Sequence, residues 1–349
     1  MTQDIRADRA GDVLAVVSQS GPTVSFFDAA SDRHLGTIEV LAEPHELCFD
    51  PTQRLLWCAT TYSSGYYHDN TGARSELTVI DPDTRRIVEV VDLGPELAPH
   101  GLALDAGRGV LYVSVEGTGD REGGVVIVDT ATRKATGRIG IGARGPHWFV
   151  ASPDGTVGYT SNKEAPFVSV VDLLAGTLTD RIDVPGSEGL AVSADGSRVY
   201  VAAPYAAFTS ASRPKDPGIR VIDATTRSVA EVLPTENIVV PVHCTATGTV
   251  LVGEVRVSAD IESGLAHQEP GRLTAFSAGS HEKLGSIEVG RCPLTITSSP
   301  DGALGYVSGV VDSTVDIIDL ATLRRVSRLD IPKLGLPGAH GLAYLPSAR

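Results

Sequence analysis

The fold of this chain is decided by a recurring unit, of which residues 294–319 give a clear copy: LTITSSPDGALGYVSGVVDSTVDIID. An apolar segment is followed by a Ser-Pro-Asp-Gly turn at 299–302, where Asp-Gly supplies the positive φ that a hairpin needs. A second strand at 305–308 and a third strand at 315–319, which ends in Asp, come next. A fourth, more polar strand completes the unit. Each unit therefore predicts a four-stranded antiparallel sheet.

The unit recurs seven times at intervals of 41 to 55 residues, the pattern of a β-propeller, and no helical periodicity competes with it. Residues 11–40 supply the second to fourth strands of a unit, whereas residues 340–345 supply a first strand with nothing after it. Pairing the two would complete the seventh blade and remove the open sheet edges. The sequence predicts an all-β fold: one seven-bladed β-propeller domain over 1–349, closed by N-terminal strands that pair with the C-terminal strand.

Composition limits the classes of partner. The 349 residues include 42% hydrophobic residues, enough for a core, and a net charge of −14 that would repel nucleic acid and anionic membranes. No apolar run approaches the roughly 18 residues that cross a bilayer, and the first six residues do not resemble a signal peptide. The cysteines lack CxxC spacing, which favours reduced thiols and a cytoplasmic location. They are Cys48, Cys58, Cys244 and Cys292.

The unit resembles the YVTN-repeat, lactonase-like family of seven-bladed propellers over essentially the whole chain. The matching elements are Pro-His-Gly-Leu segments such as 99–102, Ser-Pro-Asp-Gly turns such as 152–155 and Val-Tyr-Val strands such as 199–201. The resemblance implies the propeller fold, and the family name implies lactone hydrolysis. No residue pattern of this chain supports that reaction in particular, since one fold hosts many chemistries.

One register position, at the start of the first strand, holds histidine in five of the seven repeats. In chain order the position is filled by His45, His100, His147, Glu188, His243, Pro293 and His340. A closed propeller would gather these side chains around one axis, where buried neutral imidazoles need partners that a divalent cation provides. The five histidines are the predicted metal ligands. Three or four of them would bind, which leaves a position for water or substrate.

Four carboxylates are predicted to accept the remaining N–H of a ligating imidazole. They are Glu46, which follows a ring histidine, and Glu116, Glu164 and Glu254, which lie at or just beyond the ends of second strands. Imidazole ligands suit several transition metals. Iron or copper is favoured here, and manganese, zinc and magnesium remain alternatives.

Strand order places the loops between second and third strands on the face where the ring histidines lie. These loops carry the insertions, at 61–75, 116–123, 203–218 and 256–271, and long loops on one rim indicate a binding mouth. Their large side chains are Tyr62, Tyr66, Tyr67, His68, Tyr205, Phe208, Arg213 and His267. The predicted catalytic residues are Glu188, Tyr67 and His68, although Glu188 also fits a metal ligand or a solvated channel residue.

Three functions follow from this pattern. The first is a metal-dependent enzyme acting on a small organic substrate by redox or O₂-using chemistry, an arrangement similar to that of carotenoid-cleaving oxygenases, which hold iron with four histidines. The second is a non-redox lyase, cyclase or lactonase, in which His243 or Glu188 would act as base. The third is a propeller without activity that binds a peptide or protein on its rim.

Overall fold

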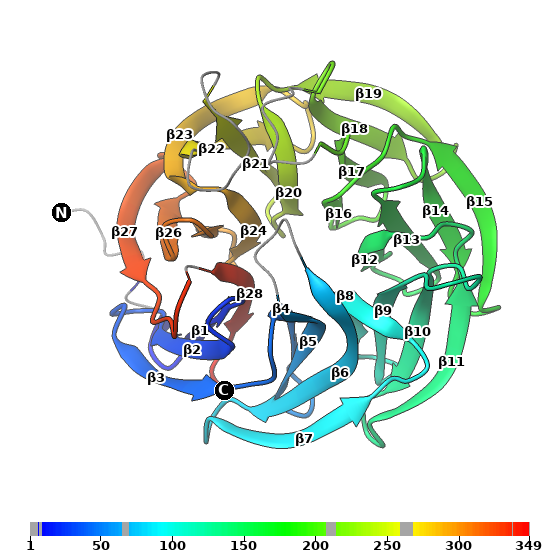
Figure 1. The fold of residues 1–349 in the computed structure, drawn as a ribbon. Helices are drawn as coiled ribbons and strands as arrows, with labels where there is room; N and C mark the ends of the chain where they lie inside the picture. Colours follow the sequence, from blue (N-terminus) through cyan, green and yellow to red (C-terminus); the bar gives the residue numbers. More distant parts are fainter. Residues whose placement is uncertain are drawn as a thin grey trace.

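The chain forms seven four-stranded antiparallel sheets arranged in a ring (Figure 1). The computed structural model describes residues 6, 9–64, 70–206, 214–258, 268–336 and 338–348. In six of the sheets the four strands follow one another in chain order, and in the seventh the C-terminal strand joins the first three strands of the chain. The predicted seven-bladed β-propeller is confirmed.

The blades are numbered from the first complete sheet. Blade 1 consists of β4 (Pro44–Asp50), β5 (Leu55–Ser64), β6 (Thr71–Asp81) and β7 (Arg86–Asp92). Blade 2 consists of β8 (Leu97–Asp105), β9 (Val110–Glu116), β10 (Gly124–Asp129) and β11 (Lys134–Gly140). Blade 3 consists of β12 (Pro146–Ala151), β13 (Val157–Asn162), β14 (Phe167–Asp172) and β15 (Thr177–Asp183). Blade 4 consists of β16 (Leu190–Val192), β17 (Arg198–Ala203), β18 (Gly218–Asp223) and β19 (Ser228–Pro234). Blade 5 consists of β20 (Ile238–Cys244), β21 (Thr249–Val257), β22 (Gln268–Ser277) and β23 (Lys283–Arg291). Blade 6 consists of β24 (Pro293–Ser298), β25 (Leu304–Gly309), β26 (Thr314–Asp319) and β27 (Arg324–Asp330). Blade 7 consists of β28 (Ala339–Leu345), β1 (Val13–Ser18), β2 (Thr23–Asp28) and β3 (His34–Glu39).

The apolar core lies between successive blades. The second and third strands, rich in Val and Ile, are buried along most of their length, whereas a fourth strand such as β7 is exposed at six of its seven residues. One interblade cluster joins Trp57 and Val79 of blade 1 to Leu111 and Val126 of blade 2. Each blade thus buries its faces against two neighbours, and the four-strand unit gains its stability from the ring.

Ring closure occurs where it was predicted. β28 pairs antiparallel with β1, with Leu14 opposite Tyr344 and Val16 opposite Leu342. This pairing joins residues more than 300 positions apart and covers the edge of β1. The described part of the chain contains no helix that could span a membrane, and its four cysteines are free thiols.

Six of the seven first strands have a β-bulge near their beginning. On β4, Pro44 pairs with Thr60 and Leu47 with Cys58, so three steps along β4 match two along β5. The same offset occurs at the start of β8, β12, β20, β24 and β28. A bulge turns the extra residues away from the regular pleat, often next to a functional site. Here it sets which residue of each first strand faces the central channel.

Candidate metal centre

The position inside each bulge defines the ring at the centre of the propeller. Aligning six of the first strands by their bulges, and that of blade 4 by the pairing of Leu190 with Val201, gives His45, His100, His147, Glu188, Val240, Leu294 and His340. All seven line one cavity of about 260 Å³. The prediction that a single register position converges on one site therefore holds, with different residues in two blades.

Blade 5 and blade 6 correct the predicted ring. In blade 5 the bulge lies between Val239 and Val242, so Val240 holds the ring position and the register assigned to His243 was wrong by three residues. His243 lies near the end of β20, where its Nε2 is 2.9 Å from Ser298 Oγ, and burial lowers its pKa to about 4. In blade 6 the ring residue is Leu294, one position after Pro293. His243 is therefore separated from the other four histidines.

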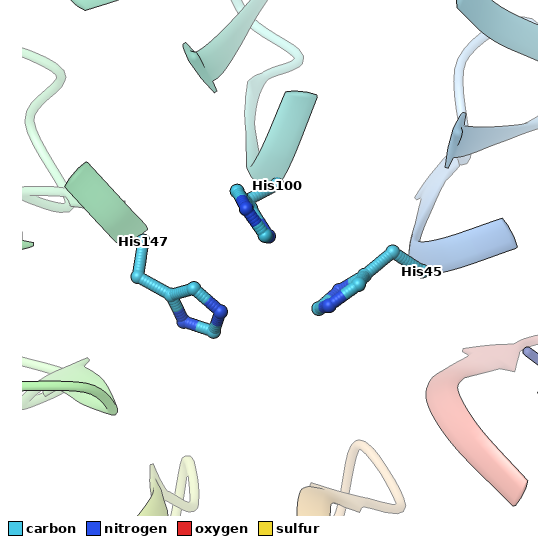
Figure 2. Close-up of side chains that lie close together, drawn as sticks. All are labelled: His45, His100 and His147. Atoms are coloured by element: carbon cyan, nitrogen blue, oxygen red, sulfur yellow. The ribbon is translucent and has the colours of Figure 1, made fainter. Parts of the chain in front are cut away.

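The four remaining histidines are buried, and the rings of three of them lie against that of the fourth, His45. The ring centroid of His45 is 4.7 Å from that of His100, 5.7 Å from that of His147 and 4.2 Å from that of His340. The centroids of His100 and His147 are 4.5 Å apart. Figure 2 shows the imidazoles of His45, His100 and His147 reaching from three strands toward one common space. One ligand atom from each of these three lies within 4.8 Å of the others.

Hydrogen bonds orient the imidazole of His100. Its Nε2–H donates to Glu116 Oε1 at 2.7 Å, and the hydroxyl of Tyr62 donates to the same oxygen at 2.8 Å. Burial would raise the pKa of Glu116, but these two hydrogen bonds and the electrostatic attraction of His100 and Lys163 together outweigh it and lower the pKa to about 2. Nε2 of His100 is thus engaged by the carboxylate, and Nδ1 is the ring nitrogen left without a hydrogen bond among the described residues. Glu116 thus occupies the place predicted for it behind a ring imidazole.

Glu46 lies between two ring histidines. Its Oε1 is 3.4 Å from His45 Nδ1 and 3.3 Å from His340 Nδ1, and the three residues form a second group that could hold a metal. Nδ1 of His340 also lies 3.2 Å from the backbone oxygen of His45. Burial raises the pKa of Glu46 well above its usual range. The second predicted carboxylate therefore also lies against the ring.

Three of the ring imidazoles, those of His45, His147 and His340, are held in their neutral form. Burial lowers the pKa of His45, His147 and His340, that of His340 to about 3. Neighbouring imidazoles and the ammonium of Lys163 lower these pKa values further, because a second positive charge is unfavourable there. Metal ions bind neutral imidazole. These three imidazoles are therefore in the protonation state that a metal ligand requires.

The donor set could hold a metal ion. The buried Nδ1 atoms of His100 and His147 have no hydrogen-bond partner among the described residues, whereas Nδ1 of His45 lies 3.4 Å from Glu46 Oε1. An unpartnered buried polar atom costs about 1–3 kcal/mol. A cation that accepts the lone pairs would remove this cost, and three imidazoles with an open position are a common catalytic ligand set. His45, His100 and His147 would hold the ion, with His340 adjacent.

A lysine that the sequence analysis missed faces the same cavity. Lys163 Nζ is 3.2 Å from Glu188 Oε1 and 5.5 Å from the ring centroid of Tyr205. Burial lowers the pKa of Lys163, but Glu188 and other anionic neighbours raise it more, so the ammonium is retained. Glu188 Oε1 is also 3.9 Å from His147 Nε2. The sequence contained one signal for Lys163. It directly follows the second strand β13, on the face of the propeller where the long loops lie.

The other predicted site residues have different placements. Glu164 lies exposed at the cavity rim, and no ring imidazole is bonded to it in the described structure. Glu254 is buried in blade 5, where it accepts hydrogen bonds from Thr274 Oγ1 at 2.6 Å and Asn237 Nδ2 at 2.8 Å, so its predicted place beside a ring histidine was wrong. The predicted loop wall is present at Tyr62 and Tyr205. The remaining predicted loop residues lie outside the described residues: Tyr66, Tyr67, His68, Phe208, Arg213 and His267.

Comparison with known proteins identifies the architecture. The structure is similar to a chain of the Kuenenia stuttgartiensis hydrazine synthase, with a TM-score of 0.67 and 16% sequence identity over 89% of this chain and 98% of that chain. The chain has the fold of a β-propeller. No protein-family model and no curated protein matches the sequence, so membership of the YVTN-repeat, lactonase-like family stays a prediction.

Lowering the pH should destabilise the metal-free protein through the ring. The unfolded chain takes up protons near pH 6.5, whereas the folded ring resists them, so stability present above pH 6.5 is lost as the pH falls toward the lowered pKa values. Each such imidazole contributes about 1.4 kcal/mol per pH unit in this window. Denaturant titrations of chelator-treated protein from pH 7.5 to 5 should show a shallower pH dependence in His147→Leu. An unchanged slope would contradict the assignment, and His34→Gln, on the exposed end of β3, is the control.

Removing the charge of Glu116 should weaken metal binding. Gln at this position can still accept from His100 but cannot increase the basicity of its imidazole, so we expect affinity to fall about 10- to 100-fold. Competition with a chromophoric chelator measures the change. Glu254→Gln is the matched control, since it alters a buried carboxylate remote from the ring histidines. An equal loss in both variants would indicate a general effect on folding instead.

Proposed function

We propose that the protein is a metal-dependent enzyme that converts a small organic substrate in the central cavity. The observation that carries the proposal is the convergence of three buried histidines, His45, His100 and His147, whose ligand atoms from blades 1, 2 and 3 lie within 4.8 Å of one another. A neutral imidazole shell leaves the full charge of a bound ion available. Iron or copper would supply redox or O₂-using chemistry there, and this is the reaction class we favour.

The surrounding residues fit an enclosed reaction site. Glu116 orients His100, and Tyr62 holds Glu116 in place by a second hydrogen bond. Glu188 presents a buried carboxylate to the cavity and is paired with Lys163. Such a carboxylate can accept a proton from a bound substrate, and we assign this role to it.

The pair of Lys163 and Glu188 also supports a non-redox alternative. A carboxylate base beside a Lewis-acidic ion is the arrangement that a lyase, cyclase or lactonase uses, with zinc, manganese or magnesium as the ion. Metal identity separates this reaction class from redox chemistry. A propeller that binds a peptide or protein on its rim, without a metal, is the remaining outcome.

Elemental analysis tests the proposal. Protein purified without an affinity tag, and protein reconstituted separately with Fe²⁺, Cu²⁺, Mn²⁺ and Zn²⁺, should each be analysed for bound metal after desalting. We expect close to one tightly bound transition-metal ion per chain for the native metal. Substoichiometric binding in every reconstitution would contradict an enzyme of either class and favour the rim-binding function.

A further inference from the structure

A second cavity lies beneath the histidine ring, on the side toward which the first strands run. Its volume is about 290 Å³, and it is enclosed by the first strands of blades 2 to 6, which surround the centre of the propeller in Figure 1. Leu102 and Leu190, each two residues after a ring position, are among its lining residues. This space, which we call the lower cavity, is therefore one layer deeper in the channel than the proposed metal site.

The lining of the lower cavity is apolar and uncharged. The described residues that line it are apolar except for His243 and Cys244, and none of them is Asp, Glu, Lys or Arg. His243 is bonded to Ser298, and burial lowers the pKa of its imidazole to about 4, so it is neutral at pH 7. Burial raises the pKa of the Cys244 thiol to about 11, so it is neutral as well. A charged ligand would lose its hydration here without gaining an ionic partner.

The lower cavity continues into a hollow of about 500 Å³ between the first strands of blades 2 and 3. The two spaces share four apolar lining residues, among them Leu102 and Val192. The hollow ends at the turns 105–107 and 152–155, where its charged residue, Asp105, is paired with Arg108 at 3.1 Å. Its size is that of a small-molecule site. A ligand can therefore enter from the face opposite the long loops without crossing the polar ring.

Trp148 lies at the boundary between the lower cavity and the ring cavity. It is half-buried and lines both spaces. Its ring centroid is 6.3 Å from that of His147, and its backbone N–H donates to Ser161 Oγ at 3.0 Å. A molecule in the lower cavity would thus lie next to a proposed metal ligand, with an aromatic side chain between the two spaces.

We infer that the lower cavity is a second binding site, which takes a small neutral apolar molecule. The site requires no metal, and it goes beyond the proposed function. When a metal ion occupies the ring, the bound molecule lies across Trp148 from it, so an apolar reactant for that ion is held close by. The uncharged lining, the size of the cavity and its separate entrance support this assignment.

Fluorine NMR of the full chain tests the inference. Metal-free and Zn²⁺-loaded protein are each titrated with three probes of similar shape: trifluoromethylbenzene, 4-(trifluoromethyl)benzoate and 4-(trifluoromethyl)benzylammonium. We expect saturable binding of the neutral probe, at least about tenfold tighter than that of either charged probe, because the lining offers no ionic partner. The affinity for the neutral probe should be the same with and without zinc.

Two substitutions of one lining residue locate the bound probe. Val192 is half-buried at the end of β16 and lines both the lower cavity and the hollow. Val192→Phe fills this space and should weaken binding of the neutral probe at least about tenfold. Val192→Thr keeps the shape of the side chain but adds a hydroxyl, and should weaken binding at least about threefold even if the larger residue disturbs the fold. Val229→Phe, at a half-buried position on the outer strand of the same blade, is the matched control and should leave the affinity unchanged.

The outcomes distinguish this inference from the proposed function. No saturable binding of the neutral probe, equal binding of all three probes, or unchanged binding in both Val192 variants would overturn the second site and leave the metal site standing. In Cu²⁺-loaded protein we expect the signal of the bound probe to be broader than in Zn²⁺-loaded protein, because Trp148 adjoins His147. If the Val192 variants weaken binding but copper causes no added broadening, the second site stands and the metal is not in the ring.

Discussion

Replacing His147 by leucine is expected to weaken metal binding by about 100-fold or more, because the loss of a ligand exceeds the 10- to 100-fold effect of losing its supporting carboxylate. The same variant should not destabilise the metal-free protein. Nδ1 of His147 has no hydrogen-bond partner among the described residues, so its removal leaves no group newly unpaired. Weaker metal binding with unchanged stability of the metal-free protein would identify His147 as a metal ligand, because replacing a structural histidine would lower stability.

The chain itself indicates that leucine fits at this position. Leu294 fills the same bulge position in blade 6, where it is buried in the cavity wall. His100 is a poorer choice for this test, since its removal would also leave Glu116 without one of its two donors. Affinity is measured by chelator competition, and stability by denaturant titration after metal removal.

His243→Leu is the control for this experiment. It removes an imidazole from the same strand type, but at the far end of β20 and away from the cavity that holds the ring. Metal affinity should remain unchanged, while the lost hydrogen bond to Ser298 lowers stability by about 1 kcal/mol. Unchanged metal binding in His147→Leu would remove His147 from the ligand set.

The propeller could be predicted from sequence because its signals are local. The Ser-Pro-Asp-Gly turn at 299–302 precedes β25, and the third strand β26 ends in Asp319, as the repeat pattern predicted. Ring closure by β28 could be predicted because residues 340–345 form a first strand with no second strand after it. Turn chemistry and strand alternation act over a few residues, so a single chain contains enough copies to identify them.

Bulge register in blade 5 could not be predicted in the same way. Pro241 resembles the prolines that precede ring histidines, but the structure places it one residue after the ring position, with its backbone close to Gly189 of blade 4. The preceding residues Ile238–Val240 are uniformly apolar and contain no cue for a bulge. A bulge is defined by the pairing of two strands, which the sequence of one strand does not contain.

The supporting residues illustrate the same limit. Glu116 and Glu254 are both buried or half-buried carboxylates near the ends of second strands, and sequence alone made them equivalent. Glu116 faces His100, whereas blade 5 offers Val240 at the ring and Glu254 bonds within its own blade. Lys163 was missed because its role depends on Glu188, which belongs to the next blade.

Replacing Gly341 by valine should disrupt ring closure and the metal centre together. A Cβ at Gly341 would lie 2.2 Å from the backbone oxygen of His45 and 3.0 Å from the Cα of Glu46, so blades 7 and 1 must move apart. Overpacking of this kind costs about 3 kcal/mol, and the displaced backbone carries His45, so metal affinity should fall as well. Denaturant and chelator titrations measure the two effects.

A second glycine makes the interpretation of this variant specific. Gly189 has the same position in blade 4, where an added Cβ would lie 2.2 Å from the backbone oxygen of Val240. Gly189→Val should therefore lower stability by a similar amount, about 3 kcal/mol, while leaving the backbone of His45, His100 and His147 in place. Gly279→Ala, whose Cβ would meet only Ser277 Oγ at 3.9 Å, should be near neutral. If both Gly341→Val and Gly189→Val lowered metal affinity equally, metal binding would depend on the integrity of the whole propeller. It would then not depend on the contact between blades 7 and 1 in particular.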